Sequence, residues 1–442
     1  MSRVLHRSLS TAPPVVTHGE GVYMHLADGG SIIDFSSGPA VVCLGHGNRR
    51  VADAIGAQAL KMAYSNTMTF SSEPAEQLAE MLVKDKPGGL SHAFFISSGS
   101  AAMEAALKLG RQYFVERGEG SRVHFISRRQ SYHGNFFGTL AASGHAKRRG
   151  IYEPILPPHF SQVSPCFPYH YQGEGESDAS YVARLAAELE AEFQRIGPNN
   201  VIAFVAETVV GATAGCVAPV PGYFRAMREV CDRHGALLIL DEIMCGVGRT
   251  GAMHAWEQEG VQPDIQAIAK GLGGGYASIG GILISERVID VLRVGSGGFV
   301  HGQTYQAHPV GCAAALEVQR IIAEQDLVAR VKTVGGYLEA RLRDRFADHP
   351  FVGDIRGRGL FWALEFVEDR ERRRPFPAEL QMAERVKEAG LSRGVGIYAN
   401  SGIVDGLAGD CAIVSPPYII TEGEIDDAIE RLGRAVDAAV GV

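Results

Sequence analysis

Short apolar runs alternate with longer helical patterns through the middle of the chain. The runs NVIAFVAE (200–207) and ALLILDE (236–242) contain almost no polar residues, and the helical pattern GYFRAMREVCDRHG (222–235) separates them. Strands that are buried on both faces have this continuous apolar character, and parallel neighbours need a crossover helix between them. We therefore predict an α/β fold with a mainly parallel sheet covered by helices on both faces. The other expected strands are 92–97, 122–127, 265–270 and 280–285.

The two ends of the chain follow a different pattern. Near the N-terminus, GVYMHLADGGSIIDFSSG (21–38) has a DGG turn signal between two short runs, as a hairpin does. Beyond residue 330 come two helical patterns, a Gly-rich segment (353–366) and a last helix that begins with a capping box, Thr421 and Glu424. We expect a large α/β domain at 61–329 and a small α+β domain built from 1–60 and 330–442.

The composition limits the class of protein. With 46% hydrophobic and 21% charged residues and a net charge of −8, the chain is neither disordered nor basic enough for nucleic acid to be its main partner. Its seven cysteines are scattered without metal-like spacing, which favours reduced thiols. No apolar run approaches the ~20 residues of a membrane span. Residues 1–18 have arginines and no acid, as transit peptides do, but no long amphipathic segment, so we expect a cytoplasmic protein.

Two loops that follow predicted strands contain residues suited to a flat, phosphorylated ligand. Ser98, Gly99 and Ser100 lead into a helix, where free N–H groups and the helix dipole favour a phosphate, although the same residues also make an ordinary N-cap. Tyr132, His133 and Gly134 follow the next strand, so the aromatic face could stack on a heterocycle or pack beneath the loop. No HExxH motif or close His/Cys group predicts a metal site.

Two charged residues stand at the ends of apolar runs. Asp241 ends ALLILD, and a buried carboxylate needs a cation, which a protonated ring nitrogen or a structural ion pair with Arg249 could supply. Lys270 ends IQAIAK, and burial lowers the pKa of a lysine enough to make it a nucleophile that forms imines with aldehydes. An attachment lysine, a carboxylate for a pyridine nitrogen, a stacking aromatic and a phosphate-binding helix start together match pyridoxal 5′-phosphate (PLP).

Several segments share one further pattern: DFSSGPAVVCLGHGN, SSGSAAMEAALK, LLILDEIMCGVGRTG, IAKGLGGG, HGQTYQAHP and VSPPYIITEGEID. The chain resembles the class III PLP-dependent aminotransferases of fold type I over nearly its whole length. The resemblance implies a mainly parallel seven-stranded sheet. It also implies that Lys270 forms the internal aldimine and shuttles the proton between the substrate and the cofactor, while Asp241 keeps the pyridine nitrogen protonated.

The resemblance implies further contacts with the cofactor. Tyr132 would stack on one face of the ring and Ile243 would pack on the other, and Thr304 would reach the phosphate of the neighbouring subunit in a homodimer. Glu207 would lie near the cofactor and the substrate. The full set of expected cofactor-binding residues is Lys270, Asp241, Ile243, Ser98, Gly99, Ser100, Tyr132, His133, Gly134, Glu207 and Thr304.

Two positions depart from the family. Ala101 stands where relatives often have an acid after the phosphate loop. The segment 398–420 has no arginine, whereas many relatives place there the arginine that grips the substrate carboxylate; Leu407 and Ile413 stand near its expected position. A carboxylate is best held by a bidentate guanidinium, so another arginine, such as Arg393, would have to replace it, or the usual substrates do not apply.

These patterns predict an aminotransferase with small-molecule substrates. We expect it to move an amino group from an amine or ω-amino acid to a keto acid such as pyruvate. The same scaffold also supports racemases or epimerases, aminomutases and decarboxylases, which run on a single substrate. A catalytically inactive binding protein with the same fold is the third alternative, although a decayed site has no reason to keep two buried charges.

Overall fold

The computed structural model describes residues 3–9 and 12–441, so four of the first eleven positions of the possible targeting segment, 1–2 and 10–11, lie outside the described residues. Its centre is a mixed seven-stranded sheet in which β10 runs opposite to the other six strands, as expected for a mainly parallel sheet. The strand order is β4 (Leu90–Ile96), β10 (Gly280–Ser285), β9 (Ile265–Ile268), β8 (Leu237–Asp241), β7 (Val201–Glu207), β5 (His124–Arg128) and β6 (Phe160–Val163).

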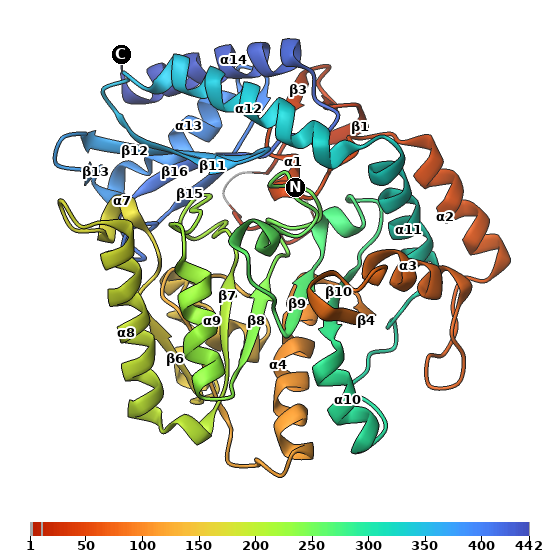
Figure 1. Ribbon diagram of the computed structural model, residues 1–442. Helices are drawn as coiled ribbons and strands as arrows, with labels where there is room; N and C mark the ends of the chain where they lie inside the picture. Colours follow the sequence, from red (N-terminus) through yellow and green to blue (C-terminus); the bar gives the residue numbers. More distant parts are fainter. Residues whose placement is uncertain (1–2, 10–11, 442) are drawn as a thin grey trace.

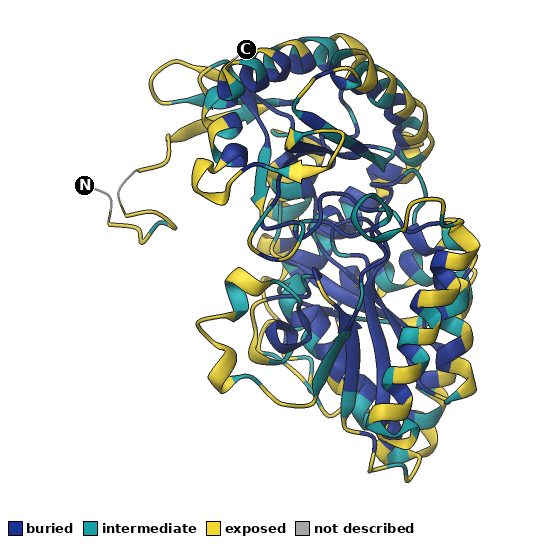
Figure 2. Cartoon of the chain, turned by 90° about the vertical axis from the view of Figure 1, so that its left-hand side faces the viewer, coloured by how far each residue is buried: buried dark blue, intermediate teal, exposed yellow. Residues whose placement is uncertain are grey.

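Alternate residues of the central strands enter two separate cores. On β7, Phe204 and Ala206 join the core that contains α8 (Asp178–Ile196) and α9 (Tyr223–Arg233). Ala203 and Val205 of the same strand join the core that contains α4 (Gly99–Glu116) and α10 (Glu286–Val294). This explains why the strand sequences are apolar without interruption: both faces are covered, as Figures 1 and 2 show.

The N-terminal and C-terminal segments meet in a second region above this sheet (Figure 1). Strand β3 (Ser31–Asp34) pairs with β14 (Val395–Gly396), which joins the two ends of the chain in a four-stranded sheet. That sheet also contains β1 (Val16–Glu20) and β2 (Tyr23–Leu26), which form a hairpin with β3 as expected. The domain boundaries at residues 61 and 329 stay predictions.

A five-stranded antiparallel sheet completes the C-terminal region. It contains β11 (Val352–Arg358), β12 (Phe361–Asp369), β13 (Arg374–Pro375), β15 (Tyr398–Ser401) and β16 (Asp410–Val414). The long helices outside the central sheet are α2 (Arg49–Lys61), α3 (Glu73–Val83), α11 (Pro309–Glu324), α12 (Leu327–Phe346), α13 (Met382–Leu391) and α14 (Glu422–Val440). The capping box predicted at the start of α14 is confirmed, since Thr421 Oγ1 accepts from Glu424 N and Glu424 Oε2 accepts from Thr421 N.

The remaining helices are short. They are α1 (Ser37–Ala40), α5 (Phe137–Ala142), α6 (Ala146–Arg149) and α7 (Pro168–Tyr171), with 3₁₀ turns at Pro87–Gly89, Glu153–Ile155, Pro198–Asn200, Ala255–Glu259, Lys270–Leu272 and Ala378–Leu380. Among the helices of the described segments, none is both long and apolar enough to cross a membrane. All seven cysteines are buried and form no disulfide.

Candidate active site

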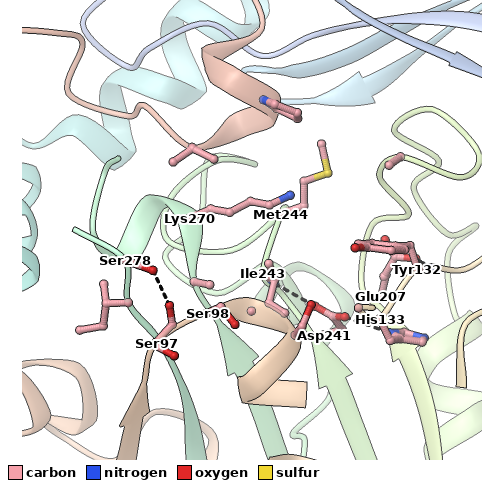
Figure 3. Close-up of a pocket in the computed structure, with 18 of the residues that line it drawn as sticks. Ser97, Ser98, Tyr132, His133, Glu207, Asp241, Ile243, Met244, Lys270 and Ser278 are labelled. Carbon is pink, nitrogen blue, oxygen red and sulfur yellow. Dashed lines mark hydrogen bonds and ion pairs between the residues drawn. The ribbon is translucent and has the colours of Figure 1, made fainter. Parts of the chain in front are cut away.

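A cavity of about 370 Å³ opens at the carboxyl end of the central sheet. Loops that follow β4, β5, β7, β8 and β9 supply its walls, as expected for a sheet whose parallel strands end at one edge. Every residue of the expected cofactor-binding set lines the cavity except Thr304 (Figure 3). The predicted strand-end residues thus line one cavity, although Ser98 and Lys270 are 172 positions apart in the sequence.

One wall of the cavity is built from small residues and main-chain groups. Ser98 caps α4 through its Oγ, which accepts from Ala101 N at 3.2 Å, and Ser100 Oγ accepts from Asn135 N at 3.2 Å. A Cβ atom on Gly99 would lie 3.0 Å from the Ile243 side chain, so a larger residue at this position would require that side chain to shift. The wall presents a helix N-terminus, which favours a phosphate.

Asp241 is a buried carboxylate without a lysine or arginine partner in the described part of the chain. It is 3% exposed; its Oδ2 lies 2.9 Å from His133 Nδ1, and its Oδ1 accepts from Ile243 N at 3.1 Å. The alternative pairing with Arg249 is wrong, because that guanidinium lies over the Tyr418 ring and donates to main-chain carbonyls. Burial of a charge without a cation is costly, so Asp241 is suited to a cationic ligand.

His133 orients Asp241. Because the carboxylate can only accept, His133 Nδ1 carries the proton of the shared hydrogen bond. The main-chain N–H of His133 donates to Ser143 Oγ at 2.8 Å, which fixes the loop. The other ring nitrogen, Nε2, is buried and has no hydrogen-bond partner among the described residues. The histidine therefore acts on the site through Nδ1, by holding one carboxylate oxygen in place.

Glu207 is also buried, at the end of β7, but its oxygens are satisfied by main-chain groups. Oε2 accepts from Tyr132 N at 3.0 Å and Oε1 accepts from Gly211 N at 3.1 Å. Burial is the largest cause that raises the pKa of this carboxyl. Glu207 thus ties the Tyr132 loop to the loop after β7 and has no arginine partner in this part of the fold.

Lys270 differs from the sequence prediction in its backbone. Strand β9 ends at Ile268, and Lys270 begins a 3₁₀ turn with a left-handed φ of 48°. Non-glycine residues seldom adopt this conformation, and it directs the side chain into the cavity towards Met244 (Figure 3). No hydrogen bond or ion pair of the side chain is present in the described structure. Burial lowers the pKa of Lys270 to about 8, although the nearby charges of Asp241 and Glu207 oppose this shift.

Glu242 is a buried residue of the site region whose structural role the sequence did not reveal. Each of its two carboxylate oxygens accepts two hydrogen bonds, from Thr208 Oγ1 and Trp256 N at Oε1 and from Ala255 N and Gln266 Nε2 at Oε2. Burial raises the pKa of Glu242 to about 7. It locks the end of β8 to the turn at Ala255–Glu259 and does not line the cavity.

Thr304 is the one expected site residue that the fold keeps apart. It is exposed on the loop before α11 and does not line the cavity. Its neighbour Gln303 accepts a hydrogen bond from Ser97 Oγ at 3.3 Å, so this loop passes beside the end of β4, just before the expected phosphate-binding residues Ser98–Ser100. A contact from Thr304 to a cofactor in the same cavity is therefore not made within one chain.

The expected positions for a substrate-binding arginine do not reach the cavity either. Leu407 is exposed, Ile413 is buried in β16, and Arg393 donates to Ala389 O and Ser392 Oγ. The structure instead brings Arg148 to the cavity wall, a residue that sequence reasoning missed. The only signal was the basic run KRR (147–149), which has no spacing that distinguishes a ligand from a solvated helix.

Comparison with known proteins assigns the family. Residues 5–436 match the family model described as aminotransferase class-III. An uncharacterised aminotransferase of Schizosaccharomyces pombe is 48% identical over 437 residues, which cover 99% of this chain and 95% of that protein. The solved structure of an (S)-enantioselective omega-transaminase from Thermomicrobium roseum has a TM-score of 0.90 and 35% identity, with 98% of this chain and 94% of the other covered.

A second solved structure, the PMP-bound form of an aminotransferase from Vibrio fluvialis, has a TM-score of 0.90 at 29% identity and covers 97% of this chain and 93% of its own. Fold and neighbours define a transaminase of fold type I. The chain belongs to the class III aminotransferase family, whose members use PLP, and it is an aminotransferase.

Proposed function

We propose that this aminotransferase uses PLP to move the amino group of a primary amine or ω-amino acid to a keto acid such as pyruvate. The observation that carries the proposal is that Lys270, which is half-buried, and Asp241, which is buried, line one cavity and form no ion pair with each other in the described structure. A ligand with an aldehyde at one position and a protonated ring nitrogen at another satisfies both groups.

The cavity fits such a cofactor. A volume of about 370 Å³ is in the range of small-molecule sites, and both Gly99 at the helix start and Ile243 line it. Tyr132 and Ile243 would flank the ring, and the N–H groups at Ser98–Ser100 would hold the phosphate. When bound, PLP supplies an electron sink that stabilises the carbanion formed at the substrate Cα.

The side chains have separate roles in this mechanism. Lys270 Nζ would hold the cofactor covalently and, once the substrate amine has displaced it, take the proton from the substrate Cα as a general base. Asp241 would hold a proton on the ring nitrogen, and His133 would keep the carboxylate oriented through the 2.9 Å contact. Met244, close to the lysine in Figure 3, provides an apolar surface for the substrate.

The test of this function is a pair of half-reactions read from the cofactor spectrum. The purified protein with PLP is expected to show a visible absorption band that a primary amine removes and pyruvate restores. Lys270→Ala should lose the band, because no other lysine in the described part of the chain lines the cavity. A wild-type protein that takes up no cofactor contradicts the PLP proposal. Loss of optical activity from one chiral amino acid without a keto acid would contradict transamination.

We also propose a homodimer in which Thr304 reaches the cofactor phosphate bound by the other copy. Thr304 is exposed near two exposed apolar residues, Val300 and Tyr305. Its loop contacts Ser97, which links β4 to Ser98–Ser100. Sedimentation should show a dimer. Thr304→Val should weaken cofactor binding but leave the dimer intact. A monomer with full cofactor affinity would rule out this arrangement.

A further inference from the structure

The cavity contains a cation that the PLP contacts do not use. Besides Lys270, two arginines line it: Arg148 and Arg7. Arg148 belongs to the short helix α6, beyond the loop that holds Tyr132, and is half-buried. Arg7 is exposed on the N-terminal segment. The question is what Arg148 binds.

Arg148 has no acidic partner among the described residues, unlike its neighbour in the same helix. Arg149 forms an ion pair with Glu153 at 2.9 Å and donates to two main-chain carbonyls. Lys147 is exposed and donates to Ser401 Oγ at 2.7 Å. Two of the three consecutive basic residues therefore have structural partners, and the third faces the cavity.

The guanidinium is held against the ring of Tyr132. Its carbon Cζ lies 4.6 Å from the ring centre, and it also interacts with the phenol oxygen. Stacking of this kind limits the motion of a long side chain, so less conformational freedom is lost when a ligand binds. The contact places the cation beside the residue proposed to flank the cofactor ring.

The acids of the cavity do not neutralise Arg148. Both oxygens of Glu207 accept main-chain hydrogen bonds, and Asp241 is held by His133 and Ile243 N. The positive charge of Arg148 also contributes to the lowered pKa of Lys270, after the larger effect of burial, which is consistent with the two cations facing one space. An anion brought in by the substrate would satisfy Arg148.

We propose that Arg148 binds the carboxylate of the amino-acid and keto-acid substrates, in place of an arginine in the segment 398–420. A planar guanidinium matches a carboxylate with two parallel hydrogen bonds, and charged hydrogen bonds of this kind are stronger than those between neutral groups. This inference rests on the proposed function and names its substrate class: a 2-oxo acid such as pyruvate, and amino acids that carry a carboxylate on the amine-bearing carbon or close to it.

The test compares substrates that differ only in the carboxylate. L-Alanine and 2-aminopropane share the amine and one methyl group, and pyruvate and acetone form the matching acceptor pair. Each half-reaction is followed by the cofactor spectrum of the holoenzyme. Arg148→Met should lower kcat/KM for alanine and pyruvate by about 10- to 150-fold, and change the rate with 2-aminopropane by less than about threefold. Lys147→Met, which removes a charge from the same helix, should leave all four rates unchanged.

Two further variants separate the alternatives. Arg148→Lys keeps the charge without the forked donors, so it should lie between the wild type and Arg148→Met for pyruvate, and it serves if the methionine variant folds poorly. An equal loss with alanine and 2-aminopropane would mean that Arg148 only positions Tyr132 and would overturn the proposal. So would a loss of pyruvate binding in Arg7→Met that is absent in Arg148→Met.

The outcome also distinguishes this inference from the proposed function. A wild-type protein that forms the cofactor band and reacts with 2-aminopropane, but has no preference for alanine over it, overturns the role of Arg148 while the PLP chemistry stands. A wild-type protein without the cofactor band overturns the proposed function itself.

Discussion

Replacing Asp241 by asparagine removes one buried charge at nearly constant shape. The carboxylate is 3% exposed, accepts from Ile243 N at 3.1 Å and lies 2.9 Å from His133 Nδ1. An asparagine can keep the first hydrogen bond through its oxygen. Its amide group then meets the protonated Nδ1, so the histidine must move its proton to Nε2, which has no partner in the described structure. The local cost is about 1–3 kcal/mol of stability.

The larger effect is on the reaction. Two unit charges about 4 Å apart interact by about 4 kcal/mol at an effective dielectric constant of 20. If Asp241 faces a protonated ring nitrogen, losing this interaction corresponds to a rate reduction of about 10³-fold. Stopped-flow measurement of the amine half-reaction should therefore show a loss between about 10² and 10³, because the ring nitrogen can still bond weakly to the amide.

A second readout separates charge from structure. The charge of Asp241 raises the pKa of Lys270 against the effect of burial, so Asp241→Asn should move that pKa below about 8 and shift the pH profile of cofactor uptake downwards. Asp264→Asn is the matched control, since Asp264 is also buried but pairs with Arg228 and does not line the cavity. It should lose stability and keep the half-reaction rate. A folded, cofactor-loaded Asp241→Asn protein within about tenfold of wild type would refute the assignment.

Three other predictions concern the amine, a glycine and a buried acid. Because burial lowers the pKa of Lys270 to about 8, the neutral amine fraction rises from about one tenth at pH 7 to about nine tenths at pH 9. Cofactor uptake by the cofactor-free protein should follow this rise and level off above pH 9; a continued climb to pH 10.5 would contradict the shift. Gly134 has φ +133°, and a Cβ there would lie 2.7 Å from Thr139 Oγ1, so Gly134→Ala should lower thermal stability and cofactor affinity. Gly118→Ala, at positive φ but in open space, should cost only about 1 kcal/mol, and equal effects would refute the steric argument. In Glu242→Gln, either orientation of the amide places its NH₂ group against a main-chain N–H, that of Ala255 or Trp256. Thermal unfolding should therefore show a loss of about 2–3 kcal/mol in the free energy of unfolding. An unchanged stability would show that water replaces these hydrogen bonds.

The strands were predictable where burial leaves a continuous mark on the sequence. Strands β7 and β8 are apolar along their whole length because alternate residues enter two cores. Strand β6 (Phe160–Val163) was missing from the predicted set, because it is a short edge strand with three half-buried residues and lacks a continuous apolar sequence. The turn at Lys270 was missed because a left-handed φ at a non-glycine residue has no sequence signal.

The strand-end residues Asp241 and Lys270 were recognisable because a charge that follows an apolar run must find a partner at the sheet edge. Arg148 was not, because nothing in a short basic run shows which of its members faces solvent and which faces a cavity. That distinction depends on how α6 packs beside Tyr132.

The sequence by itself determined the α/β layers, the strand ends and the chemical types of the groups that follow them, because burial and backbone hydrogen bonding act locally along the chain. Only the tertiary structure decided that these groups line one cavity, that among the described residues Asp241 has no lysine or arginine partner and Lys270 has no acidic one, and that Arg148 rather than Arg393 reaches the site. These properties depend on strand order and on the packing of distant segments, where a difference of a few ångströms separates an ion pair from an open site.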